Sequence, residues 1–150
     1  TKGSLSKAIR SSIAIPIFIQ PGVVDTSILV DGGVVNPLPL NRVKRTENDI
    51  VIAVNVNDLD ENNPIYKSAF KKMIPPKQEP KEIGLIDIMN MSFELQISKL
   101  VEYSILENKP DLVIQIPRNC AKTFEFYSAQ KLIELGTYAA KKALENFEKK

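Results

Sequence analysis

The sequence lacks histidine and tryptophan and contains a single cysteine, Cys120. One cysteine excludes an intramolecular disulfide, which favours a reducing compartment such as the cytoplasm. Because no histidine is present to activate the Cys120 thiol, we expect this side chain to be inert. No apolar run approaches the ~18 residues that a membrane-spanning helix needs. The longest, IAIPIFI at residues 13–19, is interrupted by Pro16. We therefore predict a cytoplasmic protein.

An excess of charge of one sign is also missing. The chain has 20 basic and 18 acidic residues, for a net charge of +2. It contains no arginine-rich or aromatic-interleaved patch, and this balance argues against nucleic acid as a partner. With 150 residues, of which 43% are hydrophobic, the chain has the size of one soluble domain or of part of one.

Apolar patterning predicts an α/β fold. Residues 49–56, DIVIAVNV, and 111–117, DLVIQIP, are rich in β-branched residues and predict two strands. The run at 49–56 is almost continuous, which is typical of a strand buried on both faces in a parallel sheet. Helical periodicity predicts helices at 84–107 and 128–147. Alternating strands and helices indicate α/β layers with right-handed crossovers.

The pattern also predicts shorter elements and the core faces of the helices. Leu5, Ile9 and Ile13 share a helical face and Ser4 precedes them as a candidate N-cap, so we expect a helix at 5–13. The remaining predicted elements are an extended run at 17–19 before a QPG turn, a strand at 28–30, short helices at 40–46 and 65–73, and a mobile surface loop at 74–82. The predicted core-facing residues are Ile86, Met89, Phe93, Ile97, Leu100 and Ser104 in one long helix, and Leu132, Leu135, Ala139, Ala143 and Phe147 in the other.

The segment ILVDGGVVNPLPL, residues 28–40, combines an acid with two glycines and two prolines. Asp31 follows the predicted strand at 28–30, which places its carboxylate at the carboxyl edge of a parallel sheet, where α/β folds bind ligands. Gly32 and Gly33 can adopt positive φ angles and turn the chain sharply, and Asn36 can hold the turn with its side chain. Two interpretations stay open. Asp31 either caps the turn by accepting backbone amide hydrogen bonds, or serves chemistry at this edge.

Three consecutive segments, KAIRSSIAIPIFIQP, ILVDGGVVNPLPL and NDIVIAVNV, closely resemble the patatin-like phospholipase family. In that family, a helix ending in small residues and the dipeptide IP precedes an extended segment. The DG-G/A motif and a hydrophobic strand follow. A fainter likeness extends to LIELGTYAAKKAL at 132–144. The resemblance covers essentially the whole chain, and its specific part lies at residues 7–56.

The resemblance implies a three-layer α/β hydrolase with a mostly parallel sheet, which cleaves lipid or related carboxylic esters with a Ser–Asp dyad. The aspartate of the family's DG-G/A motif matches Asp31, with Gly32, Gly33 and Asn36 supporting its turn. Asp31 would orient and deprotonate the serine hydroxyl, a task that histidine performs in a triad. The absence of histidine from the chain agrees with such a dyad. The resemblance implies no cofactor.

The chain departs from the family by lacking the serine nucleophile. The family carries it in G-x-S-x-G on a strand-to-helix elbow, and none of the six glycines here begins that pattern. No glycine-rich loop is present to donate amides to an oxyanion. We therefore expect residues 1–150 to be the C-terminal portion of one hydrolase domain. The missing N-terminal half would supply the serine, and the fragment alone would be inactive.

Other side chains have ordinary explanations beside functional ones. Asp58, Asp60 and Asn62 have the spacing of a calcium loop, but Asn63 replaces the turn glycine and Ala69 the glutamate, so we predict no metal site.

The basic residues Lys71, Lys72, Lys77 and Lys81 either make peripheral contact with anionic lipid head groups or form a solvated loop. Ser11 and Ser12 lack an elbow, and we expect them to pack against or cap the N-terminal helix.

A second function also stays open. The chain would then be a non-catalytic α/β binding or assembly module. Its DGG corner would contact a phosphate-bearing ligand or a partner chain through backbone amides.

Overall fold

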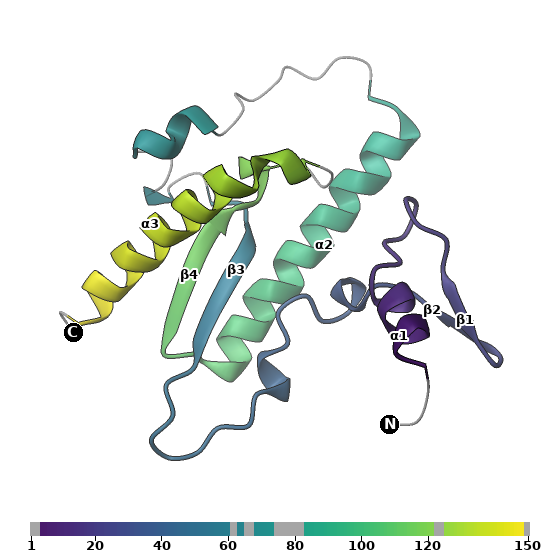
Figure 1. The fold of residues 1–150 in the computed structure, drawn as a ribbon, viewed down its shortest axis with the longest axis horizontal. Coiled ribbons are helices and arrows are strands. Elements are labelled where there is room, and N and C mark those ends of the chain that lie inside the picture. The colour runs from purple at the N-terminus through teal and green to yellow at the C-terminus, as the bar shows by residue number, and fades with distance from the viewer. Residues whose placement is uncertain (1–3, 61–62, 65–67, 74–82, 122–124, 149–150) are drawn as a thin grey trace. The chain divides into compact units, whose positions relative to one another are not determined.

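The computed structural model describes residues 4–60, 63–64, 68–73, 83–121 and 125–148. Contacts divide the chain into two compact units, Thr1–Pro37 and Leu38–Lys150. Each unit contains one two-stranded sheet, antiparallel in the first and parallel in the second (Figure 1). Helices flank the parallel strands, so the predicted α/β class is confirmed.

The first unit is built from helix α1 (Leu5–Ser12) and the hairpin of β1 (Gly22–Val24) and β2 (Ser27–Leu29). The strands pair antiparallel, with Val23 opposite Ile28. Asp25, in the connecting turn, has a φ of 53°, a left-handed conformation that aspartate adopts more readily than most residues. Strand β1 was not predicted, because three residues are too few to show an alternating pattern and the turn has no glycine.

The extended run predicted at 17–19 is wrong. Ile17 has a φ of 75°, and the amide of Ile19 donates a hydrogen bond to the carbonyl oxygen of Ile15 at 2.9 Å. The chain therefore makes a tight turn directly after Pro16. The consecutive apolar residues of this turn have the composition of a strand, which is why the sequence predicted an extended run here.

A close approach between α1 and β1 holds the first unit together. Ser11 is buried on α1, and its hydroxyl donates to the carbonyl oxygen of Lys7 at 2.9 Å, as expected for a helix-packing serine. A Cβ atom added at Gly22 would lie 2.2 Å from the Ser11 Oγ, far inside van der Waals contact. Glycine is therefore required at the start of β1 because of space.

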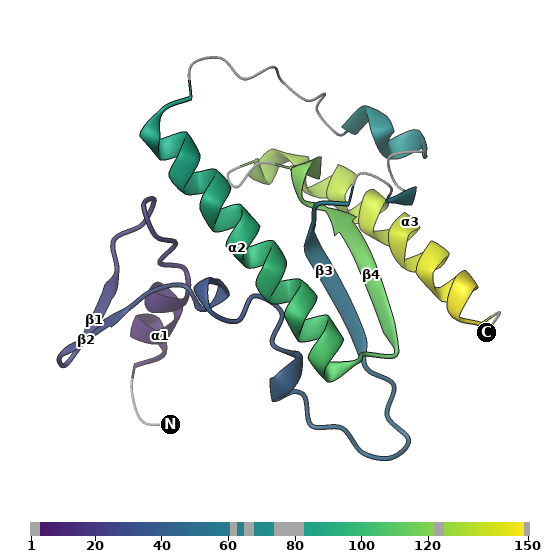
Figure 2. The same cartoon turned by 180° about the vertical axis from the view of Figure 1, so that it is seen from behind.

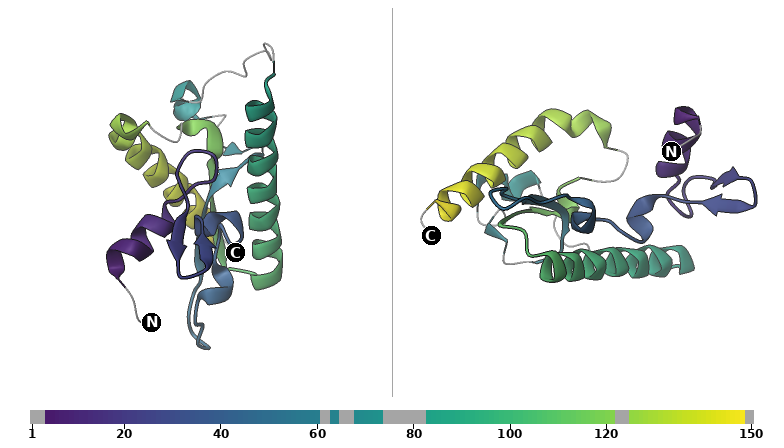
Figure 3. Two further views of the ribbon diagram at one scale, coloured as in Figure 1. Left: turned by 90° about the vertical axis from the view of Figure 1, so that its right-hand side faces the viewer. Right: turned by 90° about the horizontal axis from the view of Figure 1, so that it is seen from below.

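The second unit is a helix–sheet–helix arrangement. Strands β3 (Ile52–Asp58) and β4 (Leu112–Pro117) pair in parallel, with Val54 opposite Ile114. The connection between them includes the long helix α2 (Leu85–Asn108), and helix α3 (Ala129–Phe147) follows β4. Figures 2 and 3 show α2 on one face of the sheet and α3 on the other.

The main hydrophobic core lies between β4 and α3. Leu135 is only 1% exposed and clusters with Ala139 and with Ile114 and Ile116 of β4. Phe70 packs at the margin of this core, where its ring lies 5.2 Å from that of Tyr138. Leu135 and Ala139 are buried, and Leu132, Ala143 and Phe147 are partly buried, so the predicted core face of α3 is confirmed.

The opposite face of the sheet is covered by the C-terminal half of α2. Ile97 and Val101 are buried on α2, as is Ala53 on β3, and the Ser104 hydroxyl donates to the carbonyl oxygen of Leu38 at 2.6 Å. The helix ends at Asn108, because the next residue, Lys109, has a left-handed φ of 45° and is followed by Pro110.

The predicted core face of α2 is wrong in the first turns of the helix. Ile86 and Met89 are exposed, because the N-terminal half of α2 extends past the ends of the strands (Figure 1).

The predicted burial of the first parallel strand on both faces is also wrong within the described residues. Side chains of β3 alternate, with Ala53 and Asn55 buried and Ile52, Val54 and Val56 each more than half exposed. The reason is that α3 lies over β4 and leaves this face of β3 uncovered.

The short elements agree only in part with their predictions. In place of a helix at 40–46, a 3₁₀ helix spans Leu40–Arg42, and another spans Ala69–Met73. Residues 65–67 and the predicted loop at 74–82 lie outside the described residues. Among the helices that are described, none has both the length and the apolarity of a membrane span.

We predict that Gly22→Ala will lower the free energy of unfolding by about 1–3 kcal/mol, because the added methyl group must displace Ser11. Gly136→Ala is the matched control. No atom lies within 4 Å of its added Cβ, so alanine should stabilise α3 by roughly 0.5–1 kcal/mol. Chemical denaturation followed by circular dichroism measures both. A neutral Gly22→Ala would contradict the close packing of α1 on β1.

Candidate functional site

Asp31 lies where β2 leads into a 3₁₀ helix at Gly32–Val34. Its backbone amide donates to the carbonyl oxygen of Ala14 at 3.0 Å, and its half-buried carboxylate accepts the Gly33 amide through Oδ1 at 2.7 Å. The capping interpretation of Asp31 is therefore confirmed. Its predicted place at the edge of a parallel sheet is wrong within the described residues, because β2 pairs there with β1, in an antiparallel hairpin.

The two glycines do not act through positive φ angles, as the sequence led us to expect. Both lie in the 3₁₀ helix, and neither adopts the left-handed region. A Cβ atom at Gly33 would lie 3.0 Å from Asp31 Oδ1, whereas one at Gly32 would have open space around it. The requirement at Gly33 is therefore for the carboxylate to approach the backbone closely.

The backbone amides of residues 33–36 donate hydrogen bonds to acceptors in the same segment. The Val34 amide donates to the Asp31 carbonyl oxygen at 3.2 Å, and the amides of Val35 and Asn36 donate to that of Gly32 at 3.2 and 2.9 Å. With the Gly33 amide held by Asp31, four successive amides have internal acceptors. This arrangement does not favour a phosphate site built from these amides. The predicted role of the Asn36 side chain stays a prediction.

The carboxylate of Asp31 is held in one orientation, and part of its hydrogen-bonding capacity is not used by the described residues. Within the described part of the chain, its Oδ2 receives no hydrogen bond. None of the described serine hydroxyls donates to Asp31 either, and the Ser11 hydroxyl is occupied within α1. One oxygen thus orients the carboxylate, and the other remains able to accept a proton or a hydrogen bond from a partner group.

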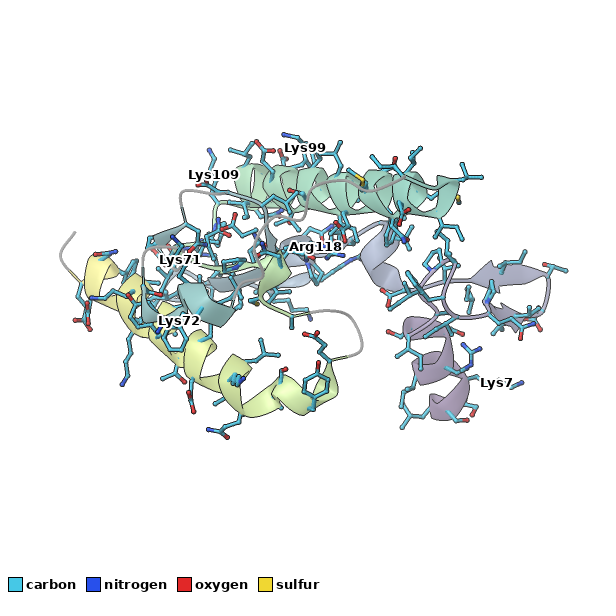
Figure 4. The ribbon with its side chains drawn as sticks, turned by 90° about the horizontal axis from the view of Figure 1, so that it is seen from above. Lys7, Lys71, Lys72, Lys99, Lys109 and Arg118 are labelled. Carbon is cyan, nitrogen blue, oxygen red and sulfur yellow. The ribbon has the colours of Figure 1, made fainter. Side chains whose placement is uncertain are left out.

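A polar cluster that the sequence reasoning missed lies at the carboxyl ends of β3 and β4. The side-chain Nδ2 of Asn55 donates to Gln115 Oε1 at 2.6 Å, across the strands. Arg118 donates to Asn57 Oδ1 at 2.6 Å and to Glu94 Oε1 of α2 at 3.2 Å. Figure 4 shows Arg118 on the sheet side of α2. Part of the signal was present in the sequence, because Asn55 and Gln115 interrupt the two predicted strands and Asn57 and Arg118 follow them.

This cluster ties β3, β4 and α2 together. Its side chains bond one another, and the buried Asn55 also accepts the amide of Asn57 at 2.9 Å. We therefore interpret it as structural support for the strand ends rather than as a ligand site.

The remaining predicted groups are dispersed. Asp58 accepts the Asp60 amide at 3.0 Å and a side-chain hydrogen bond from Asn63, whereas Asn62 lies outside the described residues.

Lys71 and Lys72 are exposed on their 3₁₀ helix (Figure 4), and Lys77 and Lys81 lie outside the described residues. Partial burial raises the pKa of the Cys120 thiol, which makes it a poorer nucleophile.

The chain is similar to uncharacterized NTE family proteins of Mycobacterium tuberculosis and Mycobacterium bovis, at 26% identity over 211 residues. These alignments cover 98% of the chain but 59% of each relative, so the chain spans well under two thirds of the length of these relatives. Lysophospholipase nte1 of Neurospora crassa is 34% identical over 64 residues, which are 43% of this chain and 4% of that protein. No protein-family profile matches the chain.

We predict that Asp31→Ala will destabilise the first unit by about 0.5–2 kcal/mol, because it removes the cap on the Gly33 amide. Asp31→Asn should retain most of that stability, since an asparagine side-chain oxygen can accept the same hydrogen bond. Thermal unfolding of both variants tests this expectation. Equal losses in the two variants would show that the negative charge, and not the cap, stabilises the turn.

Proposed function

We propose that this chain is the C-terminal portion of a patatin-like serine acyl hydrolase, acting in the cytoplasm on lipid or related carboxylic esters. In this proposal it supplies Asp31 to a Ser–Asp dyad, and a segment outside residues 1–150 supplies the serine. The similarity to NTE family proteins and to a lysophospholipase supports a lipid hydrolase. The observation that carries the role of Asp31 is its carboxylate, which is oriented through Oδ1 while Oδ2 accepts no hydrogen bond from the described residues.

The chemistry follows from that arrangement. Asp31 accepts the proton of the serine hydroxyl while the serine oxygen attacks the ester carbonyl carbon and forms a tetrahedral oxyanion. Collapse of this oxyanion breaks the ester bond, and the leaving alcohol takes the proton from Asp31. Water then attacks the acyl-enzyme and gives its proton to Asp31. The carboxylic acid departs as the serine oxygen recovers a proton.

A carboxylate is a weak base for a hydroxyl proton, so the oxyanion needs strong stabilisation from preorganised donors. The segment that carries the serine would have to provide these donors, because residues 33–36 use their own amides internally. That same use of the amides counts against the alternative of a phosphate-binding module.

Substrate contact would take place at a lipid surface. The exposed Lys71 and Lys72 can attract anionic head groups. We propose only a peripheral contact of this kind.

We expect Asp31→Asn in the full-length polypeptide to lower kcat for a chromogenic short-chain ester by about 10²–10⁴-fold, with little change in KM. Asparagine keeps the cap but cannot accept the serine proton, so the fold should remain intact by circular dichroism.

The matched control is Asp25→Asn, in the exposed hairpin turn of the same unit. Asparagine tolerates the left-handed conformation there, so activity should be unchanged. Activity near wild type in Asp31→Asn would remove Asp31 from the mechanism. The chain of residues 1–150 alone should not hydrolyse the ester.

A further inference from the structure

The first three turns of α2 carry apolar side chains on the face of the helix that is opposite the sheet. Lys99 marks this outer face, because its side chain points away from the sheet (Figure 4). Helical spacing places further residues on the same face. They form an outer stripe, which consists of Leu85, Ile88, Met91 and Leu95. Each of these four side chains is more than half exposed.

The outer stripe lies at one end of the second unit. Arg118, directly after β4, donates to Glu94 at 3.2 Å, so Glu94 lies near the level of the carboxyl ends of the strands. The turns before Glu94 therefore extend beyond the sheet (Figures 1 and 2). The next turn of the outer face is polar, with Lys99 and Glu102 in an ion pair. The stripe thus forms an apolar tip on the helix.

Elements that extend the sheet do not cover this stripe. Helix α2 contacts the sheet through its opposite face, where Ile97 and Val101 are buried. A strand added to the sheet would lie on that inner side of α2. The outer stripe faces out of the layered fold, and a cluster of exposed apolar side chains of this kind marks a surface that interacts with something else.

The chemistry of the tip fits a lipid surface better than a protein partner. Within residues 83–93 only Asp87 is charged, and its carboxylate accepts the Gly84 amide at 2.9 Å, at the start of the helix. Tyrosine, tryptophan and arginine, which dominate the hot spots of protein interfaces, are absent from these residues. Leucine, isoleucine and methionine on a projecting helix end offer apolar area to acyl chains without requiring a complementary pocket.

Cationic side chains lie at the same end of the second unit. Lys71 and Lys72 are exposed on the 3₁₀ helix Ala69–Met73. Like the start of α2, this short helix lies beyond the carboxyl ends of the strands (Figures 1 and 2). Their charge complements that of anionic lipid head groups. This end of the unit therefore combines an apolar tip with positive charge, which is the combination that peripheral lipid contact requires.

We propose that the first turns of α2 insert the outer stripe into a lipid surface, with Lys71 and Lys72 against anionic head groups. The inference rests on the proposed function, because a hydrolase of lipid esters meets its substrate at such a surface. It assigns the apolar part of the contact to α2. Because salt screens the attraction of the lysines but not the burial of apolar side chains, part of the binding should persist at high salt and on neutral lipid.

Vesicle flotation of the full-length polypeptide tests this proposal without relying on activity. The probes are vesicles of phosphatidylcholine and vesicles of phosphatidylcholine with an equimolar amount of phosphatidylglycerol. We expect the double variant Ile88→Gln, Leu95→Gln to have an at least about tenfold lower partition coefficient on both, because two apolar side chains no longer leave water. The double variant Lys71→Gln, Lys72→Gln should bind more weakly only to the phosphatidylglycerol vesicles, and only at low salt.

Leu106→Gln is the matched control, since this side chain is 66% exposed near the other end of α2. The control should bind both kinds of vesicle as the unsubstituted protein does, and circular dichroism checks that every variant is folded. Unchanged binding by Ile88→Gln, Leu95→Gln would overturn the proposal. So would a failure of the unsubstituted protein to bind either kind of vesicle.

Sedimentation velocity without lipid tests for a second copy as the occupant. We expect the same oligomeric state with and without the substitutions at Ile88 and Leu95. An oligomer that dissociates in the double variant would assign the outer stripe to a second copy and overturn the lipid contact.

The outcome is separable from that of the dyad. Asp31→Asn should bind vesicles as the unsubstituted protein does. Full esterase activity in Asp31→Asn, together with weakened vesicle binding in Ile88→Gln, Leu95→Gln, would retain the lipid contact and reject the dyad. The reverse pattern would reject only the lipid contact.

Discussion

The parallel pairing of β3 with β4 is the constraint on which the second unit depends. It aligns Val54 with Ile114 and thereby gives the sheet one continuous apolar face. Parallel strands need helices on both faces, and the chain supplies α2 for one face and α3 for the other. Helix α3 packs on β4 through Leu135. The part of the same sheet face that β3 contributes is therefore left exposed among the described residues. The exposure of β3 is therefore a consequence of where α3 lies.

In the first unit, the feature that matters for the candidate site is the turn at Asp31. Its carboxylate accepts the Gly33 amide at 2.7 Å, and the Asp31 amide is bonded to Ala14. A carboxylate held in this way loses little orientational freedom when it accepts a proton. The cap and the chemical role, which appeared as alternatives in the sequence, are thus compatible in one side chain, because each oxygen can perform one of them.

Long periodic segments of the sequence predicted their elements well, and short ones did so less consistently. The predicted helix at 128–147 corresponds to α3, with Leu135 and Ala139 buried as expected, because five turns of helix repeat the pattern enough times. The strand predicted at 28–30 corresponds to β2, but its hairpin was missed, because the three residues of β1 carry no usable period. The resemblance located Asp31, but no periodicity could reveal that its strand pairs antiparallel.

Burial was harder to predict than secondary structure. The run DIVIAVNV predicted a strand correctly, whereas its cover depends on residues distant in sequence. The polar cluster of Asn55, Gln115 and Arg118 was missed for the same reason, since its hydrogen bonds join residues about 60 positions apart. Patterns within a strand indicate which faces are apolar, but they do not indicate which helix reaches them.

The apolar side chains that β3 exposes have a consequence for how the protein is made. If the proposed serine-bearing segment precedes residues 1–150 and covers β3, it leaves the ribosome before β3 does, because translation proceeds from the N-terminus. The apolar face of β3 would then emerge when the segment that covers it has already been synthesised, so its exposure to other nascent chains would be brief. Reversing the order of the two segments by circular permutation would lengthen that exposure and increase the dependence of the protein on chaperones.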